Sequence, residues 1–422
     1  MLYDPAMSTS STIHPLASVA LRQDAGLIAL VGLAHLISHF SQLLLAPLFP
    51  WLKDAFDASY AELGFLITVF FVTSCAVQAG SGFVVDRFGP RPVLFGGLAL
   101  LGLAACGFAA STSYWMLVFF AIVAGMGNGV FHPVNYTLLN RKVSPLRLGH
   151  AYSVHGITGS LGWALAPAMM VPIALAYSWR VALSSAGVLI FLVFMLLWVK
   201  REHLGLPTAP QPVQDEVHGS ADDPLAFLRI PAVWMCFTFF FFYAAALSIV
   251  QAFAPEAARQ LHGVPLALVA VCLTTYMVCA AAGMVLGGFL ASDPAHCERV
   301  VGTGFGIAAS IAVLLALGDL TPTAVPVLFG AMGFAAGIAG PARDLLVKRS
   351  APENATGRVY GVVYSGLDIG QAVAPLIFGL LMDRTQFREV LLGLAVVQGV
   401  LIVSAFNVRR VRRTAPVAAA EF

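Results

Sequence analysis

Long apolar runs dominate the pattern of hydrophobic and polar positions along this chain. The first run, from Ala25 to Leu52, contains no Asp, Glu, Lys or Arg. A helix that crosses the hydrocarbon of a bilayer needs about 20 such residues. Gly, Pro and charged clusters divide the rest of the chain into similar runs, and we predict twelve membrane-spanning helices, at 25–49, 60–85, 92–111, 114–138, 149–174, 179–199, 230–255, 265–291, 300–318, 322–347, 357–382 and 388–408.

One break in this pattern is longer than the others. It contains the stretch GLPTAPQPVQDEVHGSADDP, whose Pro, Gly and acidic residues are unsuited to a packed core. We therefore predict a cytoplasmic linker at 200–229 between an N-terminal six-helix bundle at 25–199 and a C-terminal six-helix bundle at 230–408. Residues 1–24 lack the pattern of a signal peptide and are expected to be a disordered leader, and 409–422 a basic cytoplasmic tail.

The two predicted bundles repeat one another. At a constant offset of 208 residues, Gly and Pro positions coincide through three helix pairs, as in Gly125 with Gly333, Gly162 with Gly370 and Pro47 with Pro255. Parallel repeats of six spans, with a site near the membrane midplane where they meet, are a transporter architecture. The predicted fold class is thus an all-α integral membrane protein with twelve transmembrane helices in two pseudo-symmetric six-helix bundles.

Composition and charge support a lipid environment and give an orientation. The chain has 422 residues, of which 59% are hydrophobic and 10% charged, whereas soluble domains carry roughly a quarter charged residues. Most Lys and Arg residues between the predicted spans fall on the side that holds both termini and the linker. By the positive-inside rule, we expect that side to be cytoplasmic in a bacterial inner (cell) membrane.

Polar residues inside the predicted spans mark a candidate cavity. His35, His39 and Gln42 lie at i, i+4 and i+7 on one helix face. Polar groups at membrane depth are costly and indicate function, and here they gather in the first, fourth, fifth, seventh, tenth and eleventh spans. The predicted substrate cavity contains His35, His39, Gln42, Asn128, His132, Asn135, His155, Gln251, Arg343 and Gln371.

The His35–His39 spacing has more than one interpretation. It matches a helical metal-binding pair, but a metal site needs three or four ligands, and the Glu of an H-E-x-x-H motif is missing. We therefore predict no metal and no cofactor. Each ring could instead hydrogen-bond a carbonyl or Ser of a neighbouring helix, or face the cavity, where a His can both bind an anion and take a proton.

Two ionisable residues of the second half have candidate roles. Asp368 lies eleven residues into the eleventh span and can exchange a proton at membrane depth, so we predict that Asp368 and His39 couple transport to protons. Arg343 either extends toward the cytoplasmic basic cluster or faces the cavity, where it would bind an anionic substrate or pair with Asp368.

The connection after the second span carries a recognisable motif. Its sequence GFVVDRFGPRP resembles the G-x-x-x-D-R-x-G-R-[KR] signature of the major facilitator superfamily. The resemblance implies ion pairs at the cytoplasmic mouth that latch the outward-open state, and the matching residues are Gly82, Asp86, Arg87, Gly89 and Arg91. The second-half copy, GFLASDPAHCERV, is degraded. A basic turn that only fixes topology is the alternative.

A closer resemblance covers most of the first half. LAHLISHFSQLLLAPLFPWLKDAF, GMGNGVFHPVNYT and GHAYSVHGITGSLGWALAP are similar to the fosmidomycin-resistance branch of that superfamily. The resemblance implies a bacterial proton-driven exporter. The chain departs from this branch at His39, where the branch has an acidic residue, and at Val134, where it has a Glu.

Together these features predict a secondary active transporter and not an enzyme. The expected substrate is a small anionic or amphiphilic organic compound, moved by alternating access in proton-coupled efflux, that is, drug/proton antiport. The alternative is proton symport or exchange of a small organic anion, such as carboxylate uptake. An intramembrane metallo-enzyme would need a third ligand and a base that the sequence does not indicate. The expected partners are the substrate, protons and the lipid bilayer, with no nucleic acid, and the protein is expected to be a monomer.

Overall fold

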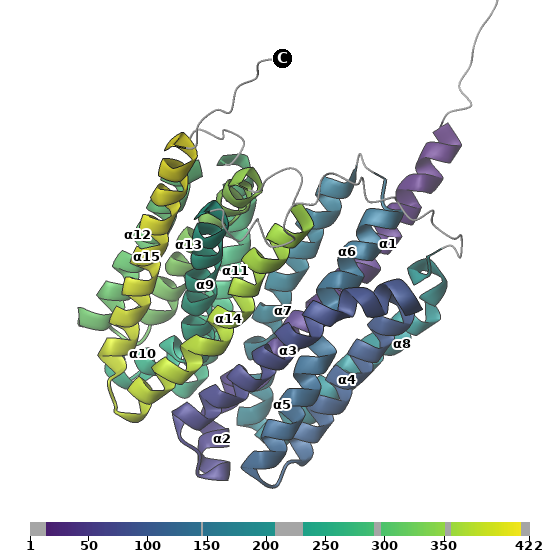
Figure 1. Ribbon diagram of the computed structural model, residues 1–422. Coiled ribbons are helices and arrows are strands. Elements are labelled where there is room, and N and C mark those ends of the chain that lie inside the picture. The colour runs from purple at the N-terminus through teal and green to yellow at the C-terminus, as the bar shows by residue number, and fades with distance from the viewer. Residues whose placement is uncertain (1–13, 145–146, 207–230, 291–296, 351–355, 415–422) are drawn as a thin grey trace, which may run out of the picture.

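The computed structural model describes residues 14–144, 147–206, 231–290, 297–350 and 356–414, with backbone only at 14–20, 232, 289, 297, 342–350, 356–364 and 404–414. Within these ranges the chain is helical with short connections and contains no strand. Figure 1 shows two groups of helices side by side, the N-terminal group in purple to teal and the C-terminal group in green to yellow. The predicted all-α fold class is confirmed.

The N-terminal bundle consists of long helices and short helical turns. Its elements are α1 (His14–Gln42), η1 (Ala46–Leu48), α2 (Phe49–Phe56), α3 (Tyr60–Phe88), α4 (Pro90–Ala110), α5 (Tyr114–Asn128), α6 (Phe131–Lys142), α7 (Leu148–Ala176), α8 (Trp179–Val199) and η3 (Arg201–Leu204).

The C-terminal bundle repeats this plan. Its elements are α9 (Pro231–Ala252), α10 (Ala254–His262), α11 (Leu266–Leu290), α12 (Cys297–Leu317), α13 (Ala324–Ser350), α14 (Thr356–Asp383) and α15 (Phe387–Thr414). The short α10 follows α9 as η1 and α2 follow α1.

Local chemistry explains several helix boundaries. Ser59 and Glu62 form a reciprocal capping box at the start of α3, which satisfies backbone N–H groups that have no partner within the helix. At the other end of α3, Gly89 adopts φ +82° and Pro90 opens α4, where its missing N–H costs nothing. Gly263 ends α10 in the left-handed conformation that glycine tolerates best.

Eleven helices within the described residues are long and apolar enough to cross a membrane. α15 occupies the place of the predicted twelfth span, and its side chains beyond residue 403 lie outside the description. Large apolar side chains point outward from these helices, among them Phe83 at 81% exposure and Trp115 and Val327 at 71%. Water would not favour such a surface, and lipid does.

The chain start differs from the sequence-based expectation. Residues 1–24 were expected to form a disordered leader, but α1 begins at His14, while residues 1–13 lie outside the description. Asp24, the charged residue just before the apolar run, is anchored by partners elsewhere in the chain. Asp24 is buried, accepts a hydrogen bond from the Ser144 backbone N–H, and pairs with Arg147 at 2.7 Å, so the helix continues past it.

Two other boundaries need comment. The predicted fourth span is one continuous candidate span, Tyr114–Lys142, made of α5 and α6 with a break between Asn128 and Phe131. Of the predicted linker, residues 207–230 lie outside the description, as do residues 415–422 of the predicted tail. The described start of the linker is held by Lys142, whose ammonium donates to the carbonyls of His203 at 2.6 Å and Gly205 at 2.8 Å.

The sequence repeat corresponds to a repeat in helix packing. A Cβ on Gly162 would lie 2.2 Å from the carbonyl oxygen of Leu36 in α1, and a Cβ on Gly370 would lie 2.2 Å from that of Phe241 in α9. Glycine at both positions therefore lets α7 and α14 approach α1 and α9 at backbone contact. The offset of 208 residues thus reflects the same close helix approach in both halves.

The two bundles meet mainly through α3 against α14 and α7 against α11. Thr68 in α3 donates to the Ala372 carbonyl of α14 at 2.6 Å. At the ends of these helices, the Asp383 carboxylate accepts the backbone N–H groups of Tyr60, at 2.6 Å, and Ala61, at 2.9 Å. A carboxylate of one bundle thereby caps the N-terminus of a helix in the other, where the helix dipole favours negative charge.

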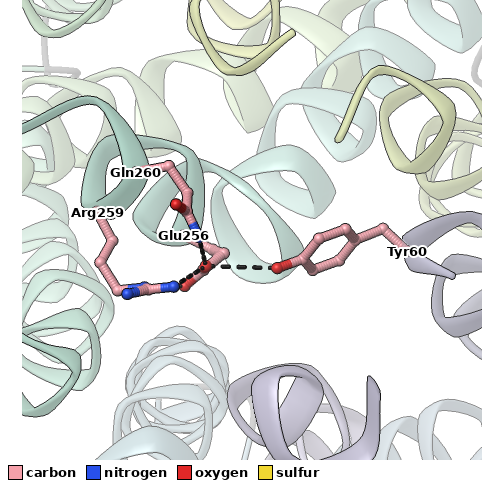
Figure 2. Close-up of polar contacts among 4 residues, drawn as sticks. All are labelled: Tyr60, Glu256, Arg259 and Gln260. Carbon is pink, nitrogen blue, oxygen red and sulfur yellow. Dashed lines mark hydrogen bonds and ion pairs between the residues drawn. The ribbon is translucent and has the colours of Figure 1, made fainter. Parts of the chain in front are cut away.

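A second polar group joins the bundles at this same end, which we call the closed end. Figure 2 shows the Tyr60 hydroxyl pointing across the interface toward Glu256 of α10, to which it donates at 3.3 Å. Glu256 is 5% exposed and is also bound by Arg259 and Gln260 of its own helix. These hydrogen bonds raise the pKa of the Arg259 guanidinium above its ordinary value. A buried carboxylate is therefore fully paired at the seam between the bundles.

Candidate functional site

A cavity of about 280 Å³ lies between the two bundles. Its N-terminal wall comes from α1, α3, α6 and α7, and its C-terminal wall from α9 and α11 to α15. Aromatic and amide side chains line it together with several ionisable groups. It has the character of a ligand site, mostly apolar with a few converging polar groups.

Four histidines form one cluster on the N-terminal wall. The rings of His35 and His155 stack with centroids 3.5 Å apart, and His39 lies 4.2 Å from His35. His132 completes the group, at 5.4 Å from His35 and 6.1 Å from His155. The helical turn between His35 and His39 presents both rings from α1, while α6 and α7 supply the other two.

Neighbouring residues hold this cluster in place. The Asn135 side-chain amide lies 3.3 Å from His155 Nε2 and 3.5 Å from His35 Nδ1. A Cβ on Gly159 would come within 2.9 Å of His35 Nε2 and 2.8 Å of His39 Nδ1, so only glycine leaves room for both rings against α7. The cluster is therefore built into the packing of α1, α6 and α7.

An amide network continues from the cluster toward the closed end. Trp163 packs against His39 with ring centroids 4.3 Å apart and planes tilted by 32°, and it donates its indole N–H to Gln42 Oε1 at 2.9 Å. Gln42 in turn donates to Asn128, whose oxygen also accepts from Ser38 and whose nitrogen donates to Ser74. Because these bonds join α1, α3, α5 and α7, the network fixes the Gln42 and Trp163 side chains that face the cavity.

The C-terminal wall carries the acidic residue of the cavity. Asp368 of α14 accepts a hydrogen bond from the Gln78 side chain of α3 at 3.3 Å. This donor belongs to the other bundle. Asp368 thus lies at the cavity surface and, at the same time, in a polar contact between the two halves.

The predicted site residues divide into three groups. The cavity is lined by His35, His39, Gln42, His132, His155, Asp368 and Gln371. Asn128 and Asn135 are buried behind the N-terminal wall, where they bond to other side chains. Gln251 lines a separate hollow of about 30 Å³ near the closed end. The side chain of Arg343 lies outside the described part of the chain, so its predicted role stays a prediction.

Several cavity residues were not predicted. Trp163, Tyr243, Tyr276 and Gln398 line the cavity. Gln398 is a polar residue within the apolar part of the twelfth span, and this position could have been used to predict that it faces the cavity. Trp163 lies in the Gly-rich stretch GITGSLGWALAP, but a Trp in an apolar segment does not by itself indicate which way it faces.

The predicted gate motif lies at the opposite end of α3 from the closed end. Asp86 pairs with Arg141 of α6 at 3.7 Å, and both side chains are well exposed. The Arg87 guanidinium lies 5.4 Å from the centroid of the adjacent Phe88 ring. Arg91 reaches toward Gly205 beyond η3, while a Cβ on Gly82 would meet open space. The described Asp86 pair is therefore contained within the N-terminal bundle.

Comparison with known proteins identifies relatives along the whole chain. The pattern described as Major Facilitator Superfamily matches residues 31–363 and 273–421. The chain is 25% identical over 413 residues to the fosmidomycin resistance protein of Escherichia coli K12, a match that covers 91% of this chain and 94% of that protein. It is 22% identical over 377 residues to the hexuronate transporter of Bacillus subtilis 168, covering 85% and 88%.

Other similarities are partial in sequence or in fold alone. A multidrug resistance protein B homolog of Mycobacterium tuberculosis is 28% identical over 162 residues, which is 38% of this chain and 30% of that protein. Among solved structures, a bacterial homolog of the human lysosomal transporter Spinster superposes with a TM-score of 0.76 at 15% identity, covering 92% and 97% of the two chains. With the helices, the cavity and these matches together, the chain belongs to the major facilitator superfamily and is a multi-pass membrane transporter rather than an enzyme.

Proposed function

We propose that this protein is a proton-coupled secondary transporter that exports a small anionic or amphiphilic organic compound across the bacterial inner membrane. A relative that matches almost end to end is named for fosmidomycin resistance, which supports export of a toxic compound. The observation that carries the proposal is the position of Asp368, which faces the cavity and bonds to the opposite bundle.

Asp368 offers a direct way to couple protons to movement. An ionised carboxylate only accepts hydrogen bonds, and bonds to an ionised group are the stronger ones. Loading a proton replaces that charge with an O–H donor and so weakens the hydrogen bond from Gln78 of α3. The proton would thus loosen α14 from α3, which is the step that a coupled transporter requires. His39, buried beside the cavity, is the second proton-coupling candidate.

The cavity lining supports the substrate class. Imidazole and amide groups offer hydrogen-bond donors to an anion, while Trp163, Tyr243 and Tyr276 supply aromatic surface for an apolar portion. A single described acidic residue, Asp368, faces them in this lining. A small compound with one anionic end fits such a site better than a cation does.

The closed end indicates from which side of the membrane the cavity is reached. Asp383 and Glu256 join the bundles beside Tyr60, and the rings of Phe49 and Phe253 meet there at 6.0 Å. The start of α1 and the end of α15 lie at the other end of the helices (Figure 1), and the distribution of Lys and Arg favours a cytoplasmic location for that end. We therefore infer that the cavity is reached from the cytoplasm in this conformation.

A second candidate function is uptake or exchange of a small organic anion. This alternative is supported by His39, which faces the cavity and occupies the position where the fosmidomycin-resistance pattern has an acidic residue. Loss of a carboxylate at this place makes the site less negative. The likeness to a hexuronate transporter agrees with such a site.

Transport by purified protein in liposomes under an imposed pH gradient distinguishes these functions. We expect an organic anion or amphiphilic drug to move against the proton flow, and Asp368→Asn to abolish gradient-driven transport while counterflow exchange persists. Asp319→Asn is the matched control, because Asp319 is exposed in a connection between helices. Proton-driven transport that survives in Asp368→Asn would contradict the coupling role, and movement of the anion with the protons would favour uptake.

A further inference from the structure

The histidine cluster contains a possible ligand set that the sequence did not reveal. One nitrogen each from His35, His132 and His155 can be chosen so that all three lie within 4.8 Å of one another. His39, one helical turn after His35 on α1, lies beside them, with its ring centroid 4.2 Å from that of His35. The helical pair on α1 lacked a third ligand in sequence, and α6 and α7 supply it in space.

We propose that His35, His132 and His155 bind a divalent transition-metal ion that favours imidazole, such as Zn²⁺, Ni²⁺ or Cu²⁺. Imidazole suits these ions, whereas Mg²⁺ and Ca²⁺ prefer oxygen ligands, which this cluster does not offer. Three histidines that leave one position open are an established arrangement for zinc. The expectation of no metal site rested on a missing third ligand, which α6 and α7 would supply under this proposal.

Metal binding requires the rings to move closer and to reorient. Tetrahedral coordination at about 2.0–2.1 Å places ligand nitrogens roughly 3.4 Å apart. The nitrogens of the cluster lie within 4.8 Å of one another, so they must approach, and the stacked His35 and His155 rings must also turn out of their parallel arrangement so that their lone pairs converge on the ion. All three rings border the cavity, which provides space for that rotation.

Asn135 is placed to orient two of the ligands. It touches His35 Nδ1 and His155 Nε2 through its side-chain nitrogen, while its Oδ1 is buried and makes no hydrogen bond among the described residues. A half-turn of this amide would let Oδ1 accept an N–H from both rings. Each ring would then present the lone pair of its other nitrogen to the ion, which is the usual role of a residue behind metal-binding histidines.

A second buried nitrogen in the cluster is also without a partner. Nδ1 of His39 makes no hydrogen bond within the described structure, although the side chain is only 8% exposed. Buried polar atoms are normally satisfied. Together with Asn135 Oδ1, this nitrogen indicates that the cluster is completed by a bound species.

The charge of the ion has a counterpart in the cavity. A divalent cation at membrane depth is costly unless it is paired. Asp368 lines the same cavity from the C-terminal wall, and the open coordination position can take an anionic group of a bound compound. The inference concerns binding to the cluster and does not depend on the direction or coupling of transport.

The test is metal binding to the full-length protein, purified through an affinity tag that contains no histidine and stripped with a chelator. Cu²⁺ is titrated in and followed by electron paramagnetic resonance, with Zn²⁺ as competitor. We expect about one Cu²⁺ per chain, with nitrogen hyperfine structure from three imidazoles, and its displacement by Zn²⁺. Cu²⁺ should also quench the fluorescence of Trp163, whose ring centroid lies 4.3 Å from that of His39.

Two variants and one control separate ligation from folding. His132→Ala should weaken binding by at least about 100-fold and remove one nitrogen from the spectrum. Asn135→Ala should weaken binding about 10-fold to 100-fold but retain the three-nitrogen signature, because it acts through the ligands. His150→Ala is the control, since His150 is exposed on the same helix as His155. Size exclusion and thermal unfolding identify any variant that fails to fold.

Three results would overturn the proposal. The wild type could bind Cu²⁺ no more tightly than His132→Ala does, His150→Ala could lose as much affinity as His132→Ala, or the spectrum could show oxygen ligands only. Transport by the metal-free protein is a separate measurement. Failure of metal binding would therefore leave proton coupling through Asp368 standing, and failure of Asp368→Asn to alter coupling would leave the metal site standing.

Discussion

At the residue scale, helix periodicity predicted which side chains share a face but not which of them reach the cavity. Asn128, His132 and Asn135 fall within about 60° of one another around a helix, yet only His132 lines the cavity. Asn128 instead bonds to Ser38 and Ser74. The difference depends on helix rotation of a few tens of degrees, and that rotation is set by neighbouring helices that the sequence pattern does not position.

Gly159 shows how tightly the cluster is packed. We expect Gly159→Ala to displace His35 and His39, because its Cβ would lie within 2.9 Å of ring nitrogens of both. Overpacking of this kind costs about 1–3 kcal/mol, so substrate affinity should fall roughly tenfold or more in a binding assay on purified protein.

The control for this change lies three residues earlier on the same helix. A Cβ on Gly156 would meet nothing within 4 Å, although Gly156 also borders the cavity. Gly156→Ala should therefore bind nearly as the wild type does. Equal affinities for the two variants would show that the positions of the His35 and His39 rings do not matter for binding.

At the element scale, the glycine repeat was the most informative feature of the sequence. Its constant offset paired positions that prove to be sites of backbone contact, as at Gly162 against α1 and Gly370 against α9. The boundaries were less predictable. The predicted first span began at residue 25, just after Asp24, and only the partners of Asp24, Ser144 and Arg147 far along the chain, explain why α1 continues past it.

The contact of α3 with α14 near the closed end leads to a prediction for these two helices. A Cβ on Gly64 would lie 2.6 Å from the Pro375 carbonyl oxygen. Gly64→Ala should therefore push α3 from α14 and shift the population away from this conformation, by about 1–3 kcal/mol. Hydrogen exchange of the first turns of α3 and the last turns of α14 should speed up.

Gly80→Ala on the same helix is the control, because its Cβ would meet open space. It should exchange hydrogen at the closed end as the wild type does. If Gly64→Ala and Gly80→Ala give the same protection there, packing at Gly64 does not hold the bundles together.

At the scale of the whole molecule, the two-bundle fold was predicted from patterns visible in the sequence: the length of the apolar runs, the repeat and the low content of charged residues. The contacts at the closed end were not predicted. Tyr60 meets Glu256 across 196 residues, and Asp383 caps α3 across 323 residues. These residues lie at helix ends, where a polar residue is unremarkable, so no pattern distinguishes those that join the bundles from those that face solvent.

The proposed transport function requires the two bundles to open and close the cavity alternately at its two ends, and distances at both ends of the molecule test this requirement most directly. Spin labels can be attached through a ketone-bearing amino acid, which leaves the native cysteines in place. One pair, at Asp54 and Thr321, spans the closed end, and the other, at Glu202 and Arg299, spans the end that holds the gate motif. All four side chains are exposed.

Double electron–electron resonance is then recorded across a pH series that loads and unloads Asp368, with and without transported compound. We predict that the Asp54–Thr321 distance lengthens by several ångströms as the Glu202–Arg299 distance shortens, and that Asp368→Asn removes the pH dependence of both. Two distances that stay fixed, or that lengthen and shorten together, would contradict alternating access about this cavity.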